Sequence, residues 1–358
     1  MIRREFAWAV IFGCVLLSAC GEQTETSAAP PQVVDRFDVG EGVYVRSLAV
    51  DTETNSLWVG SSVGVLEIDL QSHEMLNNFT RKDPLANEYI FAIGIDSAGY
   101  KWFGTNAGGV SRYRDGDWKV FFPMHGLADY WVYCFAEQSG GRFWIGTWAG
   151  ANLVDLDTMR FSTIKDELIN EWVYGIAVDS QDRVWFGTEG GVSMLDGEQW
   201  SHWTHSDGIG VANEKDLPLS QNTGLGTRTR HDLSVIVGGQ ESYNPNYVFS
   251  VLVDTNDAVW VGTWGGGVSS YQDGAWRNYS MSDGLAGDIV YSIAQGNDGV
   301  YWFGTNRGLS RFDGRQWNNY SVADGLLGEH VYAVATSADS SIWAGTLNGV
   351  VRLATAQQ

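Results

Sequence analysis

A tetrapeptide, Trp-x-Gly-Thr, recurs along this chain of 358 residues at an almost constant spacing, with serine in place of threonine in the first copy. The seven copies begin at Trp58, Trp102, Trp144, Trp185, Trp260, Trp302 and Trp343. Successive tryptophans are 44, 42, 41, 75, 42 and 41 residues apart. A period of roughly 40 to 45 residues with a tryptophan signature is typical of four-stranded propeller blades. The sequence therefore predicts an all-β fold, a seven-bladed β-propeller.

One repeat shows how such a blade is built. Residues 290–294 have the pattern of an inner strand, and residues 301–305, 309–312 and 316–320 follow as three further strands separated by glycine-containing turns. The strand that carries the tryptophan is apolar on both faces, as expected for a sheet covered on each side. The glycine two residues after the tryptophan faces the same way and permits close approach of a neighbour.

The two ends of the chain indicate how the ring closes. The last repeat has no outer strand after residues 350–353, and residues 33–37 have the pattern of the strand that is missing. We expect the N-terminal segment to complete the last blade, because this closes the ring and hides two sheet edges. The propeller would then span residues 33–358.

The first twenty residues have the features of an export signal. Arg3 and Arg4 precede an apolar stretch over residues 6–17, and Leu17-Ser18-Ala19-Cys20 resembles the bacterial lipobox. We therefore expect a lipoprotein signal peptide over residues 1–19 and a flexible tether over residues 20–32 that starts at lipidated Cys20. The alternative is an ordinary signal peptide with an incidental cysteine. Either way the chain is expected in the cell envelope, and the lipid anchor favours the outer membrane, on its periplasmic face or at the surface.

Composition limits the partners. The formal net charge is −21, which disfavours phosphate backbones and anionic headgroups, so we expect no nucleic acid and membrane contact through the lipid anchor only. Cys134 is the one cysteine left after export, and its apolar surroundings predict a small buried residue rather than a nucleophile. We expect a monomer.

The repeat pattern of an inner strand, an Asp/Gly turn, Trp-x-Gly-Thr and a following glycine resembles the two-component regulator propeller repeat, over residues 33–353. This resemblance implies the extracytoplasmic sensor half of regulators that respond to glycans or their breakdown products. The sequence shows no second membrane segment, no histidine kinase and no room for the immunoglobulin-like domain that usually follows. A sensing role would therefore require an envelope or sensor-kinase partner.

The long interval marks an insertion at about residues 205–245, between Trp203 and Tyr247. Long connections in compact domains are commonly lids, binding loops or neutral insertions. We keep both interpretations, a lid or partner-binding segment and a neutral insertion.

Aromatic residues point to a ligand site at the mouth of the central channel. Trp148 and Trp264 directly follow the signature threonine, where an indole could stack on a sugar face or aromatic ligand. A second series precedes each inner strand and comprises Tyr44, Tyr89, Trp131, Trp172, Tyr247, Ile289 and His330. Arg307, in the turn after the sixth signature, is a further ligand-binding candidate. The alternative is that these rings only pack between blades.

No catalytic or metal motif is found in the sequence. The Asp turn at residues 254–257 lacks the ligand alternation and the bidentate glutamate of a calcium loop, so it is interpreted as structural. We predict no catalytic residue, no metal site and no cofactor. Carboxylates beside the inner strands, at Glu88, Glu171 and Glu329, together with His330, nevertheless leave an enzyme open.

These observations favour a ligand-binding or sensor propeller outside the cytoplasmic membrane, which recognises a glycan or similar small ligand and acts with a partner protein. One alternative is a carbohydrate-active enzyme, a lyase or glycosidase. A further alternative is a scaffold for protein assembly in the envelope.

Overall fold

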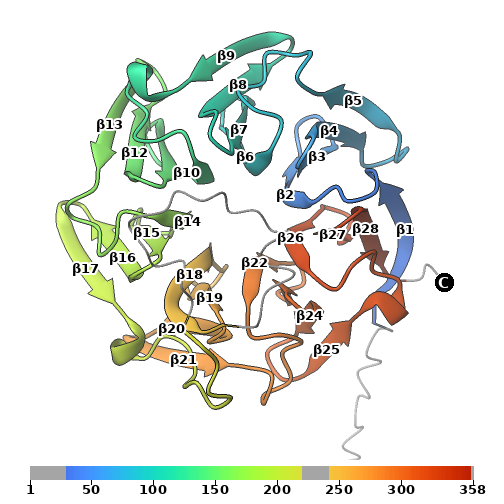
Figure 1. Ribbon diagram of the computed structural model, residues 1–358, viewed down its shortest axis with the longest axis vertical. Helices are drawn as coiled ribbons and strands as arrows, with labels where there is room; N and C mark the ends of the chain where they lie inside the picture. The colour runs from blue at the N-terminus through green and yellow to red at the C-terminus, as the bar shows by residue number, and fades with distance from the viewer. Residues whose placement is uncertain (1–29, 220–241, 356–358) are drawn as a thin grey trace, which may run out of the picture.

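The structure is a computed structural model that describes residues 30–219 and 242–355. These residues form seven four-stranded antiparallel sheets arranged around a central axis (Figure 1). The predicted seven-bladed propeller is confirmed. Cys20, the signal peptide and the middle of the predicted insertion lie outside the described residues.

In six blades the strands run outward from the axis in chain order, and in the last blade β26, β27 and β28 are followed by β1. The first blade contains β2 (Val45–Asp51), β3 (Ser56–Ser61), β4 (Gly64–Asp69) and β5 (Met75–Phe79), and the second contains β6 (Ile90–Ile95), β7 (Lys101–Thr105), β8 (Val110–Arg114) and β9 (Asp117–Phe121). The third blade contains β10 (Val132–Gln138), β11 (Arg142–Thr147), β12 (Gly150–Asp155) and β13 (Arg160–Ile164). The fourth blade contains β14 (Val173–Val178), β15 (Val184–Thr188), β16 (Gly191–Asp196) and β17 (Gln199–Trp203).

The last three blades contain the remaining strands. They are β18 (Asn244–Val253), β19 (Val259–Trp264), β20 (Val268–Gln272) and β21 (Ala275–Tyr279); β22 (Val290–Gln295), β23 (Tyr301–Thr305), β24 (Gly308–Phe312) and β25 (Trp317–Tyr320); β26 (Val331–Thr336), β27 (Ile342–Thr346) and β28 (Gly349–Ala354) with β1 (Gln32–Asp38). Short 3-10 helices η1 (Pro123–His125), η2 (His205–Asp207) and η4 (Val322–Asp324) lie in connections between blades.

In five of the seven blades, the indole N–H of the signature tryptophan donates to a side chain six residues earlier, in or just before the preceding turn. The indole N–H of Trp102 donates to Asp96 at 2.9 Å, and that of Trp260 donates to Asp254 at 2.9 Å. Asp254 also accepts a hydrogen bond from the Tyr301 hydroxyl at 2.6 Å and from two backbone N–H groups of its own turn. Its carboxylate is thus used by the blade, and the structural interpretation of this turn agrees with these bonds.

The signature glycine sets the distance between blades. A Cβ atom on Gly345 in β27 would lie 2.5 Å from Cγ1 of Val45 in β2, which is too close for any larger residue. Seven of the eight hydrophobic clusters among the described residues lie between consecutive blades, and each contains signature tryptophans or their neighbours. Packing between sheets is therefore where most of the buried apolar surface lies.

The N-terminal strand belongs to the last blade. Strand β1 pairs antiparallel with β28 from Gln32 opposite Ala354 to Asp38 opposite Gly349. Asp35 of β1 also forms an ion pair of 2.6 Å with Arg352 of β28. The N-terminal strand and the C-terminal strand therefore lie in one blade. Inner strand β26 of this blade contacts β2 of the first blade, which closes the ring.

The start of the predicted insertion differs from expectation. His205–Asp207 forms the same 3-10 turn, followed by a left-handed glycine, that Pro123–His125 and Val322–Asp324 form in other connections. These residues therefore belong to the common connection between blades. The chain departs from this common connection only after the left-handed glycine. A β-bridge between Leu219 and Tyr243 joins the two described sides of the insertion.

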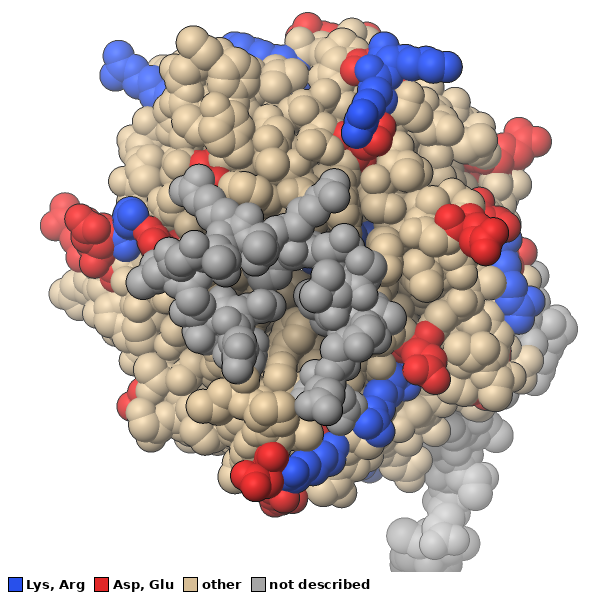
Figure 2. Space-filling view, in the orientation of Figure 1, with Lys and Arg blue, Asp and Glu red and all other residues tan. Residues whose placement is uncertain are grey.

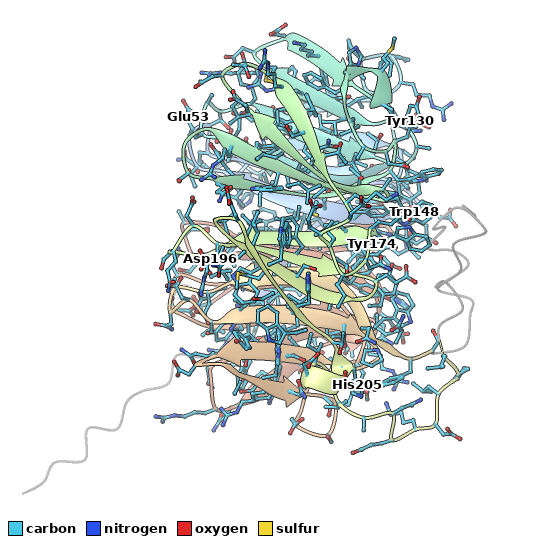
Figure 3. The ribbon with its side chains drawn as sticks, turned by 90° about the vertical axis from the view of Figure 1, so that its left-hand side faces the viewer. Glu53, Tyr130, Trp148, Tyr174, Asp196 and His205 are labelled. Atoms are coloured by element: carbon cyan, nitrogen blue, oxygen red, sulfur yellow. The ribbon has the colours of Figure 1, made fainter. Side chains whose placement is uncertain are left out.

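The disc has two distinct faces. Seen from the side, Tyr130 and Trp148 lie on one face and Glu53 and Asp196 on the other (Figure 3). On the face shown in Figure 2, the charged side chains that are visible lie mostly toward the periphery. The described residues include no helix of the length and hydropathy needed to cross a bilayer.

Candidate functional site

Every inner strand carries a β-bulge close to its start. The register between the inner strand and the next strand shifts around one residue in all seven blades. A bulge leaves one residue unpaired and can re-aim its side chain. The bulged residues are Arg46, Phe91, Tyr133, Tyr174, Phe249, Tyr291 and Tyr332.

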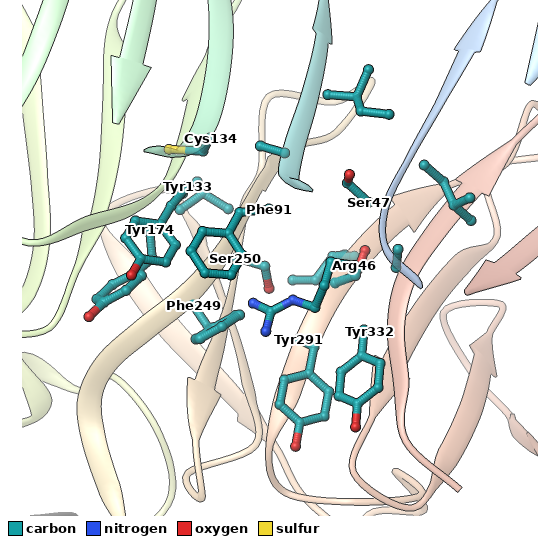
Figure 4. A pocket seen from close by; sticks show the side chains of 18 of the residues that line it. Arg46, Ser47, Phe91, Tyr133, Cys134, Tyr174, Phe249, Ser250, Tyr291 and Tyr332 are labelled. Atoms are coloured by element: carbon teal, nitrogen blue, oxygen red, sulfur yellow. The ribbon is translucent and has the colours of Figure 1, made fainter. Parts of the chain in front are cut away.

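These seven bulged residues line a cavity of about 300 Å³ in the central channel (Figure 4). Six of them are aromatic and one is a cation. Small residues follow the bulge, such as Ser47, Cys134 and Ser250, and they also line the cavity. We call this cavity, with its ring of bulged residues, the channel site.

A second layer of aromatic residues surrounds the entrance of the channel site. Together with the channel rings it forms the eighth hydrophobic cluster, the one that does not lie between two consecutive blades. Its members outside the channel ring are Tyr44, Tyr89, Trp131, Trp148, Trp172, Tyr247, Trp264 and Ile289. We call these residues the rim. The structure thus brings together seven of the nine predicted ligand-binding residues.

The two remaining candidates lie differently. His330 stacks on Tyr332 of the channel ring with ring centroids 5.7 Å apart, and its Nδ1 shares a hydrogen bond of 3.1 Å with the Tyr291 hydroxyl. Burial lowers the pKa of His330, although the neighbouring Glu329 opposes this shift. His330 is therefore adjacent to the site. Arg307 is exposed in the turn between β23 and β24 and is not a member of the aromatic cluster.

Trp148 and Trp264 are built into the rim. Trp148 lies between Trp131 and Trp172, with ring centroids 5.0 Å away on each side, and its indole N–H donates to the Tyr174 hydroxyl at 3.0 Å. Trp264 stacks on Tyr247 at 5.5 Å and donates to Ser242 at 2.9 Å. Each indole is only 5% exposed. Packing is therefore one role of both residues, and ligand stacking stays a prediction.

A buried carboxyl group, Glu189, lies beside the aromatic cluster. It follows the fourth signature threonine, is 5% exposed, and its Oε2 accepts a hydrogen bond of 3.3 Å from the Tyr174 hydroxyl. Its other oxygen, Oε1, is buried without a hydrogen-bond partner in the part of the chain that the structure describes. Burial raises the pKa of Glu189 to about 8, because the charged form loses its hydration.

Two of the three carboxylates that were candidates for an enzyme form ion pairs on the loops. Glu88 forms an ion pair of 2.9 Å with Arg81, and Glu171 forms one with Lys165. Glu329 is exposed. Cys134 lines the channel site, but burial raises the pKa of its thiol and disfavours the thiolate. The described residues contain no group of three or more metal-ligating side chains.

The sequence analysis identified the rim but missed the channel ring. In an extended strand, residues i and i+2 share one side. The residue two positions after each rim residue that precedes an inner strand is therefore the channel residue, as with Tyr89 and Phe91 or Trp172 and Tyr174. This alternation was the signal available in the sequence, and it also isolates Arg46 as the exception.

Comparison with known proteins supports the repeat assignment. The sequence profile of the two component regulator propeller matches residues 167–190, 242–265 and 284–307. No curated protein matches the chain in sequence.

Several solved structures share the fold. The extracellular domains of two proposed two component systems of the hybrid type from B. thetaiotaomicron, BT3049 and BT4673, superpose with TM-scores of 0.69 and 0.66, each at 20% identity and over 90% of this chain. The chain spans 41% and 39% of those two domains. Virginiamycin B lyase from Staphylococcus aureus, crystallised with quinupristin, has a TM-score of 0.65 at 12% identity, and the match covers 89% of this chain and 98% of the lyase. The chain is thus a seven-bladed propeller in which three segments match the two component regulator propeller repeat.

Proposed function

We propose that this chain is an extracytoplasmic ligand-binding or sensor propeller that recognises a glycan or similar small ligand at the mouth of its central channel. The observation that carries the proposal is the two-layered aromatic funnel, in which the rim leads into the channel site of about 300 Å³. Binding sites for small molecules are concave, mostly apolar and supplied with a few polar groups. The channel site is concave and combines six aromatic rings with Arg46, but more of its exposed lining is polar than apolar.

The setting of this function follows from two further points. The fold is that of the extracellular domains of two component systems, which supports a sensor acting through a partner protein. The lipobox-like residues 17–20 support a lipid anchor at Cys20 and a place in the cell envelope, on the outer membrane. The envelope or sensor-kinase partner would read the ligand-bound state of the propeller. We propose a monomeric propeller.

A thermal-shift screen of the purified chain against pooled oligosaccharides tests this proposal. A ligand at about one hundred times its dissociation constant adds roughly 2.7 kcal/mol to the free energy of unfolding, which is readily measured. Phe91→Leu should reduce the shift, because it removes an aromatic face that stacks on Tyr133 at 4.9 Å while keeping most of the volume. Phe122→Leu, on a half-buried ring in a connection between blades, is the matched control.

Two results would count against the proposal. The first is a complete absence of stabilisation by any pool. The second is a thermal shift of the same size in the Phe91→Leu variant as in the Phe122→Leu control. In either case capture of a stable protein partner that is indifferent to sugars would favour the assembly scaffold.

A carbohydrate-active enzyme is the second candidate, and it is favoured by one observation. Glu189 is a buried carboxyl group that keeps its proton near neutral pH and contacts the channel residue Tyr174, as a general acid would require. Chromatography of a bound oligosaccharide after incubation separates the two functions. Cleavage of the oligosaccharide that is lost in Glu189→Gln would show that the chain is an enzyme. An oligosaccharide that stays intact would favour a binding module without catalytic activity.

A further inference from the structure

The ring of bulged residues has one exception to its aromatic character. Arg46 in β2 occupies the position at which the other six blades place phenylalanine or tyrosine. Of the described residues that line the channel site, it is the only charged one. The site therefore has a sevenfold aromatic plan in which a single cation replaces one ring (Figure 4).

The surroundings of the Arg46 guanidinium group are aromatic. Its central carbon lies 5.1 Å from the ring centroid of Phe91, 5.9 Å from that of Phe249 and 6.0 Å from that of Tyr332. These are cation–π distances, and they fix the side chain over the cavity. Ring faces do not, however, supply the in-plane acceptors that the five N–H groups of a guanidinium require.

Among the described residues, the lack of a carboxylate counter-ion distinguishes the Arg46 side chain from comparable arginines. Arg112, Arg183 and Arg352 each form an ion pair with an aspartate, at 2.9, 2.6 and 2.6 Å. Within the described ranges, Arg46 has neither a hydrogen bond nor a carboxylate within ion-pair distance. The chain has 43 acidic residues against 22 basic ones, so an acidic partner would have been readily available.

Other polar groups in the channel site are also unused. Ser47, Ser250 and Tyr332 each have a buried hydroxyl oxygen without a hydrogen-bond partner among the described residues. All three side chains line the same cavity as Arg46. These oxygens are closed off from solvent, and those of Ser47 and Ser250 lie against Gly60 and Gly262 of the adjacent strands. Arg46 is therefore the group in this site that can meet a negative charge.

We propose that the channel site binds the carboxylate of an acidic sugar, with Arg46 as its bidentate partner. A planar guanidinium group matches a carboxylate with two parallel hydrogen bonds. A single cation matches a single negative charge, so a carboxylate suits the site better than a doubly charged phosphate. The cavity of about 300 Å³ is of the size needed for one sugar unit, and the aromatic rings offer flat faces to it. The sugar assignment rests on the proposed function, while the carboxylate site does not.

The first experiment uses acetate and its neutral analogue acetamide, so that it depends on no glycan. Nuclear magnetic resonance of the purified chain records the signals of the arginine Nε–H groups. The Arg46 signal is the one that disappears in Arg46→Lys. We expect acetate to shift the Arg46 signal along a saturating curve and acetamide to leave it in place. Arg277, exposed on the outer strand β21, is the control signal. No shift at Arg46, or an equal shift at Arg277, would overturn the carboxylate site.

The second experiment tests the sugar. Calorimetry compares oligogalacturonate and oligomannuronate trimers with their carboxyl-reduced counterparts, in which a neutral CH2OH group replaces each of the three carboxylates. We expect the acidic trimer that fits to bind roughly tenfold more tightly than its reduced form, as the loss of one charged hydrogen-bonded pair predicts. Arg46→Gln should abolish this preference, and Arg277→Gln should retain it.

The outcomes separate the two proposals. Equal binding of the acidic and reduced trimers by the unaltered chain would overturn the role of Arg46 while supporting a glycan-binding propeller. A positive acetate result with no binding of any trimer would support the carboxylate site and overturn its assignment to these acidic sugars. Circular dichroism of Arg46→Gln shows whether the variant is folded, and Arg46→Lys repeats the comparison with the charge kept.

Discussion

Glu189 should make the stability of the propeller depend on pH. Its pKa is about 8 in the folded protein, against 4.5 for an ordinary glutamate, so the folded state holds the proton more tightly than the unfolded chain does. The contribution of Glu189 to stability is therefore fully present below about pH 4.5 and declines as the pH rises toward 8. At about 1.4 kcal/mol per pKa unit, the loss is on the order of a few kcal/mol.

The variant Glu189→Gln measures this effect. We expect it to melt at nearly the same temperature as the unaltered chain at pH 4.5 and at a clearly higher temperature at pH 8 to 9. Glu198→Gln, on an exposed turn, should show no such divergence. Parallel melting curves for Glu189→Gln and the unaltered chain at every pH would show that the carboxyl group is not held in its neutral form.

Trp148 should contribute to stability whether or not it binds a ligand. Trp148→Ala removes contacts with Trp131 and Trp172 and the hydrogen bond to Tyr174, so we expect a loss of about 3–5 kcal/mol in urea unfolding. Tyr130→Ala, on the same face and 44% exposed, should change stability by only about 0.5 kcal/mol. Similar midpoints for both variants would mean that the rim does not pack as described.

Burial of the rim also limits what the sequence could show about the site. The tryptophans could be placed at the channel mouth from their position after the signature threonine, and the structure has them there. Their burial could not be predicted, because it depends on neighbours from adjacent blades, such as Trp131 and Trp172 on either side of Trp148. Glu189 was equally hidden, since its unusual pKa arises from burial and not from any motif.

At the level of elements, the repeat made the blades predictable. The expected strands 290–294, 301–305, 309–312 and 316–320 correspond to Val290–Gln295, Tyr301–Thr305, Gly308–Phe312 and Trp317–Tyr320. Turn glycines and the tryptophan period mark these boundaries directly. The bulge in each inner strand could not be seen, because a shift of register changes pairing without changing the apolar pattern. The side chains that line the channel could still have been located from the i, i+2 alternation with the rim residues.

Strand β1 should stabilise the whole propeller and not only its last blade. Deletion of residues 32–38 exposes the edge of β28 and removes the Asp35–Arg352 ion pair and the contacts of Phe37 with Trp343. We expect the deletion to lower the melting temperature strongly while unfolding stays a single cooperative transition. Circular dichroism during heating measures both. Deletion of residues 24–28 is the control, and an identical melting curve for both deletions would contradict this role.

At the level of the whole molecule, net charge should govern association with other polyanions. With a formal charge of −21, the chain should bind neither duplex DNA nor vesicles of anionic phospholipid at about 150 mM salt, where the range of screened repulsion is about 8 Å. Co-sedimentation of the unlipidated protein with neutral and anionic vesicles checks this. Stronger retention on anionic vesicles would reveal a local basic surface that outweighs the overall charge.

The pairing of β1 with β28 has a consequence for how the protein is made. Asp35 and Arg352 are 317 residues apart in sequence, so the first strand to emerge during synthesis must wait for the last. Contacts of such long range slow folding, because a long loop must close before they form. A chain that ends before β28 cannot close the ring of blades. It keeps unpaired strand edges, which are exposed to proteolysis and aggregation. Completion of the ring therefore depends on synthesis having continued through β28.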